Sequence, residues 1–290
     1  MDRKAGNSGR RFPKALFAVC AVAASGVAAV AGVALSKGVR FVRADSGLAI
    51  VETVEDASGR PVRVLRYGGV YQSASYLDEG RRFEPVFAYY RAFDLVFRTG
   101  RPVHDVLAVG GGGCSWPKHA VTSREDVRID VVEVDRGIAR AAERWFFLDE
   151  AASSARRGSS LALHVADGRA WLEGEGPLYD AVVNDAFSGR EPAMALASLE
   201  AVRAVKRRLR PGGVYAANVV SRDEGLDVGF LRDVVATLCE EFENVVVFEC
   251  ADEEFGQEDN YLAMASDGPL PSEGAIPFDE AFLGSVIHDA

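Results

Sequence analysis

The chain has 290 residues, of which 48% are hydrophobic, so it is long enough to bury one large core or a core with a small appendage. Its formal net charge of −10 argues against a nucleic-acid partner, because such binding depends on clustered Lys and Arg that neutralise phosphates. The four cysteines form no CxxC pair and have no spacing typical of a zinc site.

The chain begins with a basic tail, residues 1–14, followed by residues 15–35, which carry no charge. At 1.5 Å per helical residue the uncharged segment would be about 30 Å long, enough to cross a bilayer. We therefore expect a single N-terminal membrane anchor. A cleaved signal peptide and a helix packed on the domain are the alternatives. We expect the catalytic domain on the cytoplasmic side, where its cofactor would be, although the basic residues that flank the segment do not settle this.

Alternating apolar residues and turn formers over residues 46–80 predict a small antiparallel β unit. Its strands are expected in GLAIVETVED, RPVRVLRY and VYQSAS. Residues 81–290 form the second predicted domain. It opens with Phe83 to Phe97, where aromatic residues at helical spacing predict a helix.

A strand, a glycine loop and a helix start follow one another from Val106 onward. Val106 to Val109 is a short apolar run typical of a strand buried on both faces. Gly110, Gly111, Gly112 and Gly113 come next, and a helix is expected to begin near Ser115. Glycines let a backbone approach a ligand closely, so this segment predicts a cradle for a nucleoside. A tight turn without a ligand is the alternative.

Acidic residues stand where each of the next three predicted strands ends. The strands and the residues at their ends are Arg128–Val134 with Glu133 and Asp135, Leu161–Ala166 with Asp167 and Gly168, and Tyr179–Asn184 with Asp185. Open α/β sheets bind ligands at the carboxyl ends of their strands. We therefore expect the acids to converge on one crevice, with a ribose near Glu133. For each acid, a helix cap or a turn is the alternative.

Three further strands are predicted in Val214–Val220, Asn244–Glu249 and Tyr261–Ala265. Helical patterns separate most of the strands, and the last strand is expected to pair antiparallel with its neighbour. The predicted fold is therefore α/β, with a doubly wound, mostly parallel, Rossmann-like sheet of seven strands behind the small antiparallel β unit.

The motifs GGVYQS, VLAVGGGG, VVEVD, ADGRAW, YDAVVNDAFSG and KRRLRPGGVYAANVVS resemble the spermidine synthase (polyamine aminopropyltransferase) family within the class I S-adenosylmethionine-binding fold. The resemblance covers about Ser46 to Asp267. It implies an aminopropyl transfer from decarboxylated S-adenosylmethionine, or a related reaction of S-adenosylmethionine, to a small amine such as putrescine. No metal is implied, because the sulfonium is its own leaving group. Family members are often dimers or tetramers, so the resemblance also implies a homo-oligomer.

The resemblance also implies a role for each motif residue. Gly110 to Gly112 would line the aminopropyl arm of the cofactor, and Glu133 would bind its ribose. Asp167, with Gly168 beside it, would bind the adenine amino group. Gln72 would border the sulfonium region, and Asp185 would be the catalytic residue. A primary amine is mostly protonated at pH 7, and removing its proton at that pH costs about 4 to 5 kcal/mol. A carboxylate at Asp185 would orient the ammonium and help to remove its proton.

The chain departs from the family in the residues that hold the amine. Gly113 and Ser188 stand where the family usually has aspartates, and the Tyr-His-Glu run is absent, although Tyr89 and Tyr90 are nearby in sequence. Glu191 or the acids of residues 252–254 are candidate substitutes. A methyltransferase that uses S-adenosylmethionine, and a non-catalytic relative that kept only the fold, therefore remain alternatives.

Overall fold

The computed structural model describes residues 38–45, 47–188, 191–192, 194–220, 228–250 and 260–289. Two compact units divide the chain, Met1–Arg40 and Phe41–Ala290, and nearly all described residues lie in the second. The predicted basic tail (1–14) and uncharged segment (15–35) lie outside the described residues. The predicted boundary between residues 46–80 and 81–290 stays a prediction.

The predicted membrane-anchored localisation is wrong for the part of the chain that the structure describes. None of its helices combines the length and the apolar character needed to span a bilayer. The longest of them, α8 (Gly229–Cys239), has 11 residues. It is thus about 16 Å long, roughly half the thickness of a hydrocarbon core. The expectation of a membrane partner is corrected together with the localisation.

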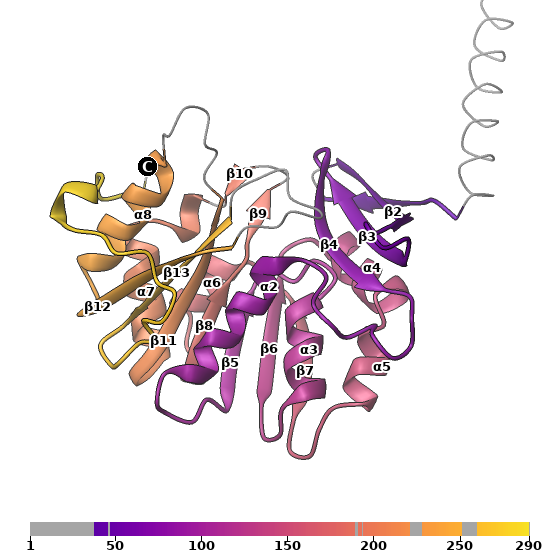
Figure 1. The fold of residues 1–290 in the computed structure, drawn as a ribbon, viewed down its shortest axis with the longest axis horizontal. Coiled ribbons are helices and arrows are strands. Elements are labelled where there is room, and N and C mark those ends of the chain that lie inside the picture. The colour runs from indigo at the N-terminus through magenta and orange to yellow at the C-terminus, as the bar shows by residue number, and fades with distance from the viewer. Residues whose placement is uncertain are drawn as a thin grey trace, which may run out of the picture. The chain divides into compact units, whose positions relative to one another are not determined.

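A four-stranded sheet forms the N-terminal β unit (Figure 1). Its strands, adjacent in chain order, are β1 (Arg40–Ala44), β2 (Gly47–Glu55), β3 (Pro61–Tyr67) and β4 (Val70–Tyr76). The last three pair antiparallel, as the alternating pattern predicts. β1 was not predicted, because its RFVRA segment has only two buried positions, Val42 and Ala44.

The second sheet has seven strands in the order β12-β13-β11-β8-β5-β6-β7. Their bounds are β5 (Asp105–Val109), β6 (Arg128–Glu133), β7 (Ser160–Val165), β8 (Tyr179–Asn184), β11 (Leu209–Val220), β12 (Asn244–Glu249) and β13 (Asn260–Ser266). All neighbours are parallel except β13, which pairs antiparallel with both β11 and β12. The predicted doubly wound, mostly parallel sheet is confirmed.

Successive residues of β5 enter opposite faces of this sheet. Val106 and Ala108 belong to one buried cluster, whereas Leu107 and Val109 belong to another. Because side chains alternate along a strand, a central strand with apolar layers on both faces needs an unbroken apolar run. The first cluster includes residues of α3 (Ser115–Ser123), and the second includes residues of α7 (Leu199–Arg208) and α8.

The remaining helices differ from the predictions in two places. Their bounds are α2 (Ala88–Ala92), the 3₁₀ helix η1 (Phe93–Arg98), α4 (Arg136–Trp145), α5 (Leu148–Ser153), α6 (Gly168–Glu173), η2 (Met194–Leu196) and η3 (Glu280–Phe282). The single helix expected over Phe83–Phe97 is a short α-helix followed by η1, and it begins after Pro85, whose ring disfavours a helical residue before it. The short helix α5, which begins directly after Phe147, was not predicted.

The β unit is joined to the seven-stranded sheet by buried polar contacts with α3. Ser115 Oγ donates to the carbonyl of Ala74 at 2.7 Å. The ammonium of Lys118 donates to Ser75 Oγ at 2.9 Å and to the carbonyl of Phe146 at 2.5 Å. Burial lowers the pKa of Lys118 to about 7. These contacts place β4 beside the glycine loop that precedes α3.

Candidate functional site

A cavity of about 480 Å³ lies at the carboxyl ends of β5, β6 and β8, between the central sheet and the β unit. Its lining includes every site residue that the sequence analysis predicted: Gln72, Gly110, Gly111, Gly112, Glu133, Asp167, Gly168 and Asp185. Parallel pairing brings these ends together, because Val109 is in register with Val132 on one side and with Asn184 on the other. Their grouping at one edge follows from the strand order.

The glycine loop lets the backbone pass closely over the end of β8. Gly110 has a φ of 92°, and a Cβ there would overlap the carbonyl of Asp185. A Cβ on Gly111 would lie 3.0 Å from the Cβ of Glu133, so a side chain there would require a small shift of Glu133. Gly110, with its positive φ and its contact with backbone, needs glycine. The absence of side chains leaves space against the loop, as a closely approaching ligand would require.

Glu133 holds the glycine loop in place. Its Oε2 accepts hydrogen bonds from the backbone nitrogens of Gly111 at 3.0 Å and Gly112 at 2.9 Å. Its Oε1 accepts from the nitrogen of Asp135 at 2.9 Å. Burial raises the pKa of Glu133, and the three hydrogen bonds oppose that rise. A carboxylate has about four acceptor positions, so capacity remains for a hydroxyl donor.

Asp135 contacts α4 and the β unit. Its Oδ1 accepts from the nitrogens of Gly137 at 2.7 Å and Ile138 at 3.1 Å, so it caps α4. Its Oδ2 accepts from the nitrogen of Asp45, in the turn after β1. The two acids at the end of β6 thus have different contacts: Glu133 supports the glycine loop, and Asp135 joins α4 to the β unit.

Asp167 caps α6 and also lines the cavity. Its Oδ1 accepts from the nitrogen of Ala170 at 2.8 Å. One oxygen of Asp167 therefore acts as a helix cap, which was the alternative expected for this residue. Gly168 packs against Val109, because a Cβ there would lie 2.5 Å from the Cγ1 of that residue. The start of α6 therefore packs directly against the end of β5.

Asp185 lies at the end of β8 with its carboxylate in the cavity lining. Asn218 Nδ2 donates to its Oδ1 at 2.9 Å, and the Tyr89 hydroxyl donates to its Oδ2 at 3.4 Å. Burial raises the pKa of Asp185 to about 7, and both hydrogen bonds act in the opposite direction. A group with that pKa can both accept and release a proton near neutrality, which suits a general base.

Two adjacent tyrosines border the site. Tyr89 contacts Asp185, while Tyr90 lines the cavity and donates its hydroxyl to the carbonyl of Gln72 at 3.3 Å. Their ring centroids are 4.3 Å apart. The aromatic spacing of this segment predicted a core helix. A polar role was visible only as two adjacent hydroxyls within this aromatic-rich run.

The structure explains one departure from the family pattern. Gly113 is buried, and a Cβ there would lie 2.7 Å from Ser73 Oγ and 2.8 Å from the ring of Phe146. No acidic side chain fits at this position without a shift of its neighbours. Ser188 lies in β9 (Phe187–Ser188), which pairs with β10 (Glu191–Pro192). The side chains of Ser188 and Glu191 and all of residues 251–259 lie outside the description.

Comparison with known proteins gives partial matches to polyamine-synthesising enzymes. A polyamine aminopropyltransferase of Nitrosomonas europaea is 30% identical over 159 residues, covering 55% of this chain and 46% of that protein. Spermidine synthase 2 of Datura stramonium is 30% identical over 49% of this chain and 43% of that protein. The chain thus spans less than half the length of these curated relatives. No protein-family model matches it.

Solved structures match over more of the chain. A probable spermidine synthase from Corynebacterium glutamicum has a TM-score of 0.69 at 22% identity and covers 87% of this chain and 96% of its own. A spermidine synthase in complex with the transition-state analogue AdoDATO has a TM-score of 0.62 at 18% identity, over 82% and 77% of the two chains. At these identities the structures support the fold. Together with the curated relatives, they confirm the resemblance to spermidine synthases.

Proposed function

We propose that this chain is a spermidine synthase-like aminopropyltransferase, which moves an aminopropyl group from decarboxylated S-adenosylmethionine to a small amine such as putrescine. One observation carries the proposal: Glu133, Asp167 and Asp185 line a single cavity beside the glycine loop. The similarity to aminopropyltransferases supports the same assignment. Both substrates are cationic, and a cavity with several carboxylates favours cations by Coulomb attraction.

The cavity has features that fit such a nucleoside. The missing Cβ atoms at Gly110 and Gly111 leave the backbone open to close approach. Glu133 retains acceptor capacity for ribose hydroxyls. Asp167 uses one oxygen to cap α6, and its other oxygen is proposed to accept from the adenine amino group. When bound, the sulfonium would supply an activated carbon together with its own leaving group.

Asp185 is proposed to prepare the attacking amine. Its carboxylate would hold the ammonium and take one of its protons, which frees the nitrogen lone pair to form the new N–C bond while the C–S bond breaks and methylthioadenosine leaves. A primary amine with a pKa of about 10.4 is neutral in only about one molecule in a thousand at pH 7. A base with a pKa of about 7 that stands next to the nitrogen reduces this deficit. Asn218 and Tyr89 fix the direction in which the carboxylate points.

Methyl transfer to an amine is the second candidate. A human eEF1A lysine and N-terminal methyltransferase is 31% identical over 144 residues, covering 45% of this chain and 20% of that protein. The same Asp185 chemistry would serve an amine that attacks a methyl carbon. The two candidates differ in the cofactor that they use and in the nucleoside that they release.

Calorimetry with the purified chain separates the candidates. Aminopropyl transfer predicts tighter binding of decarboxylated S-adenosylmethionine than of S-adenosylmethionine, and release of methylthioadenosine when putrescine is added. Methyl transfer predicts the opposite preference and release of S-adenosylhomocysteine. Binding of neither cofactor nor of methylthioadenosine would contradict both candidates and would favour a non-catalytic relative.

A further inference from the structure

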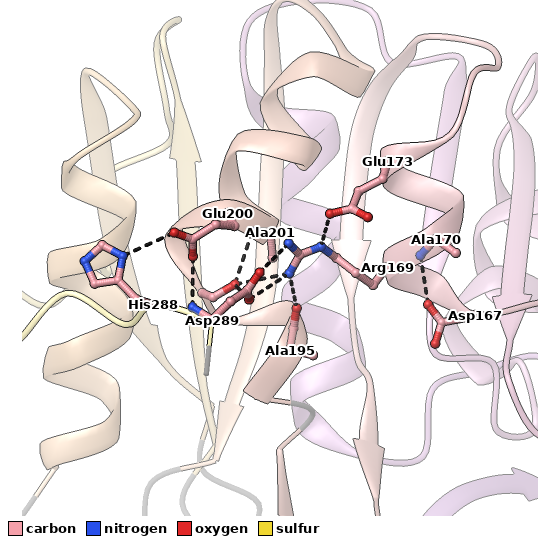
Figure 2. Close-up of polar contacts among 10 residues, drawn as sticks. Asp167, Arg169, Ala170, Glu173, Ala195, Glu200, Ala201, His288 and Asp289 are labelled. Carbon is pink, nitrogen blue, oxygen red and sulfur yellow. Dashed lines mark hydrogen bonds and ion pairs between the residues drawn. The ribbon is translucent and has the colours of Figure 1, made fainter.

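Arg169 lines the cavity, and its guanidinium donates hydrogen bonds to four residues, Glu173, Ala195, Ser198 and Asp289 (Figure 2). Nε donates to Glu173 Oε1 at 2.7 Å, one turn further along α6. Nη1 donates to the carbonyl of Ala195 at 2.8 Å, in η2. The fork formed by Nη1 and Nη2 donates to both carboxylate oxygens of Asp289, at 3.1 and 2.7 Å. Arg169 therefore ties the first turn of α6 to two distant segments.

One of these segments is part of the cavity wall. Ala195 and Leu196 line the same cavity as Asp167 and Gly168. Leu196 lies close to the start of α6, because a Cβ on Gly168 would be 3.8 Å from its Cδ1. The contact between Arg169 and the Ala195 carbonyl thus holds η2 beside the turn that carries Asp167. This is the part of the cavity assigned to adenine in the proposed function.

Asp289 belongs to a segment, residues 282–289, that packs along α7 and α8. Its backbone nitrogen donates to Glu200 Oε2 at 3.0 Å, and the nitrogen of Leu199 donates to the carbonyl of Ile287 at 2.8 Å. Ser198, the cap of α7, donates its hydroxyl to Asp289 Oδ1 at 2.6 Å. Asp289 is thus held in place by contacts of its backbone nitrogen and its carboxylate that do not involve Arg169.

The charges of the pair reinforce this arrangement. The hydrogen bond with Asp289 is the main influence that raises the pKa of Arg169, and the hydrogen bond with Arg169 holds the pKa of Asp289 below its usual range. The geometry is bidentate, which fixes the plane of the guanidinium as well as its position. A guanidinium fixed in this way presents Nη1 to the Ala195 carbonyl in one orientation.

We propose that Asp289 is a positioning residue for nucleoside binding: through Arg169 it holds Ala195 and Leu196 against the start of α6, and so shapes the adenine end of the cavity. The inference rests on the proposed function, because that function assigns adenine to this end. Asp289 is outside the set of described residues that line the cavity. Its effect is therefore expected in nucleoside affinity and in the local order of η2, with the rate at saturating cofactor unchanged.

The test combines two measurements on the full chain. Calorimetry with methylthioadenosine should show affinity about three- to tenfold weaker for Asp289→Asn, with partial recovery in Asp289→Glu. Hydrogen exchange should become faster at the amide of Ala197, which donates to the carbonyl of Met194 in η2. Glu173→Gln is the matched control, because it removes a contact of the same guanidinium that does not reach η2. It should change affinity less than about twofold.

A double-variant cycle adds a further check. If Asp289 acts through Arg169, then Arg169→Ala combined with Asp289→Asn should bind no more weakly than Arg169→Ala alone. Wild-type affinity and wild-type exchange in Asp289→Asn would overturn the inference, as would an equal loss in Glu173→Gln. Faster exchange in Asp289→Asn, with no nucleoside binding by the wild-type chain, would overturn the proposed function and the binding role, and would leave only a structural contact.

Discussion

Asn218 Nδ2 lies 2.9 Å from Asp185 Oδ1 and donates a hydrogen bond to it, so an amide from β11 orients the carboxylate at the end of β8. Asn218 is adjacent to β8 because β8 and β11 pair in parallel, with Ala217 in register with Asn184. The hydrogen bond favours the charged form of Asp185 against the effect of burial. The state of this carboxylate underlies the first predictions.

Asp185→Asn should abolish turnover and spare nucleoside binding. The amide keeps the shape and one acceptor oxygen of the side chain but cannot accept the amine proton, so the rate should fall about a hundredfold or more. Product formation and calorimetry with methylthioadenosine measure the two effects. Unchanged turnover would remove Asp185 from the mechanism, and a parallel loss of nucleoside binding would assign it to binding.

The pH dependence of turnover should report the ionisation of Asp185. Activity should rise with pH through a midpoint near 7, because the ionised form is the base. Asn218→Leu and Tyr89→Phe should each move the midpoint upward, since each removes a hydrogen bond that favours the charged form. The shift should be larger for Asn218→Leu, whose contact has the stronger influence on this pKa. A midpoint that does not move in either variant would contradict this assignment.

The same raised pKa predicts how stability depends on pH. Between pH 3.8 and about 7 the folded chain keeps a proton on Asp185 that the unfolded chain loses, so this group makes the free energy of unfolding fall as pH rises. The loss is at most about 4 kcal/mol for a shift of this size. Asp185→Asn should therefore gain stability relative to wild type at pH 8 and show little difference at pH 4. Denaturant unfolding at the two pH values measures the difference.

Gly113→Asp should not restore the carboxylate that the family has at this position. The new side chain would overlap Ser73 Oγ and the Phe146 ring, so the variant should lose about 3 kcal/mol of stability or more. Gly113→Ala adds a smaller, uncharged side chain, so it should lose less stability than Gly113→Asp. Chemical unfolding and putrescine titration are the measurements. A stable Gly113→Asp variant with improved amine affinity would contradict the close packing at this position.

Glu133→Gln should weaken nucleoside binding about tenfold and leave the fold intact. The amide oxygen can still accept from the glycine loop, but the acceptor for ribose loses its charge. Asp135→Ala is the comparison, because that side chain caps α4, and it should lower stability by about 1 kcal/mol with a smaller effect on affinity. A Glu133→Gln variant that melts at low temperature, with unchanged affinity, would make Glu133 purely structural.

The sequence by itself determined the sheet and the grouping of the predicted site residues. Apolar runs such as Val106 to Val109 are long enough only for strands, and the glycines that follow can form only a turn or a loop. Once the strands are parallel, their carboxyl ends share one edge. The expectation that Glu133, Asp167 and Asp185 meet at this edge needed only the parallel strands, and all three line the cavity.

Only the tertiary structure decided which side chains support those residues. Tyr89 reaches Asp185 from 96 residues away, and Arg169 reaches Asp289 from 120 residues away. The lack of space at Gly113 depends on Phe146, the residue that follows α4. Local patterns carry no record of such distances, because they arise when separate elements pack together. The periodicity of apolar residues determines which face of a helix or strand is buried. The contacts that change the pKa of a side chain depend on which other elements pack against that face.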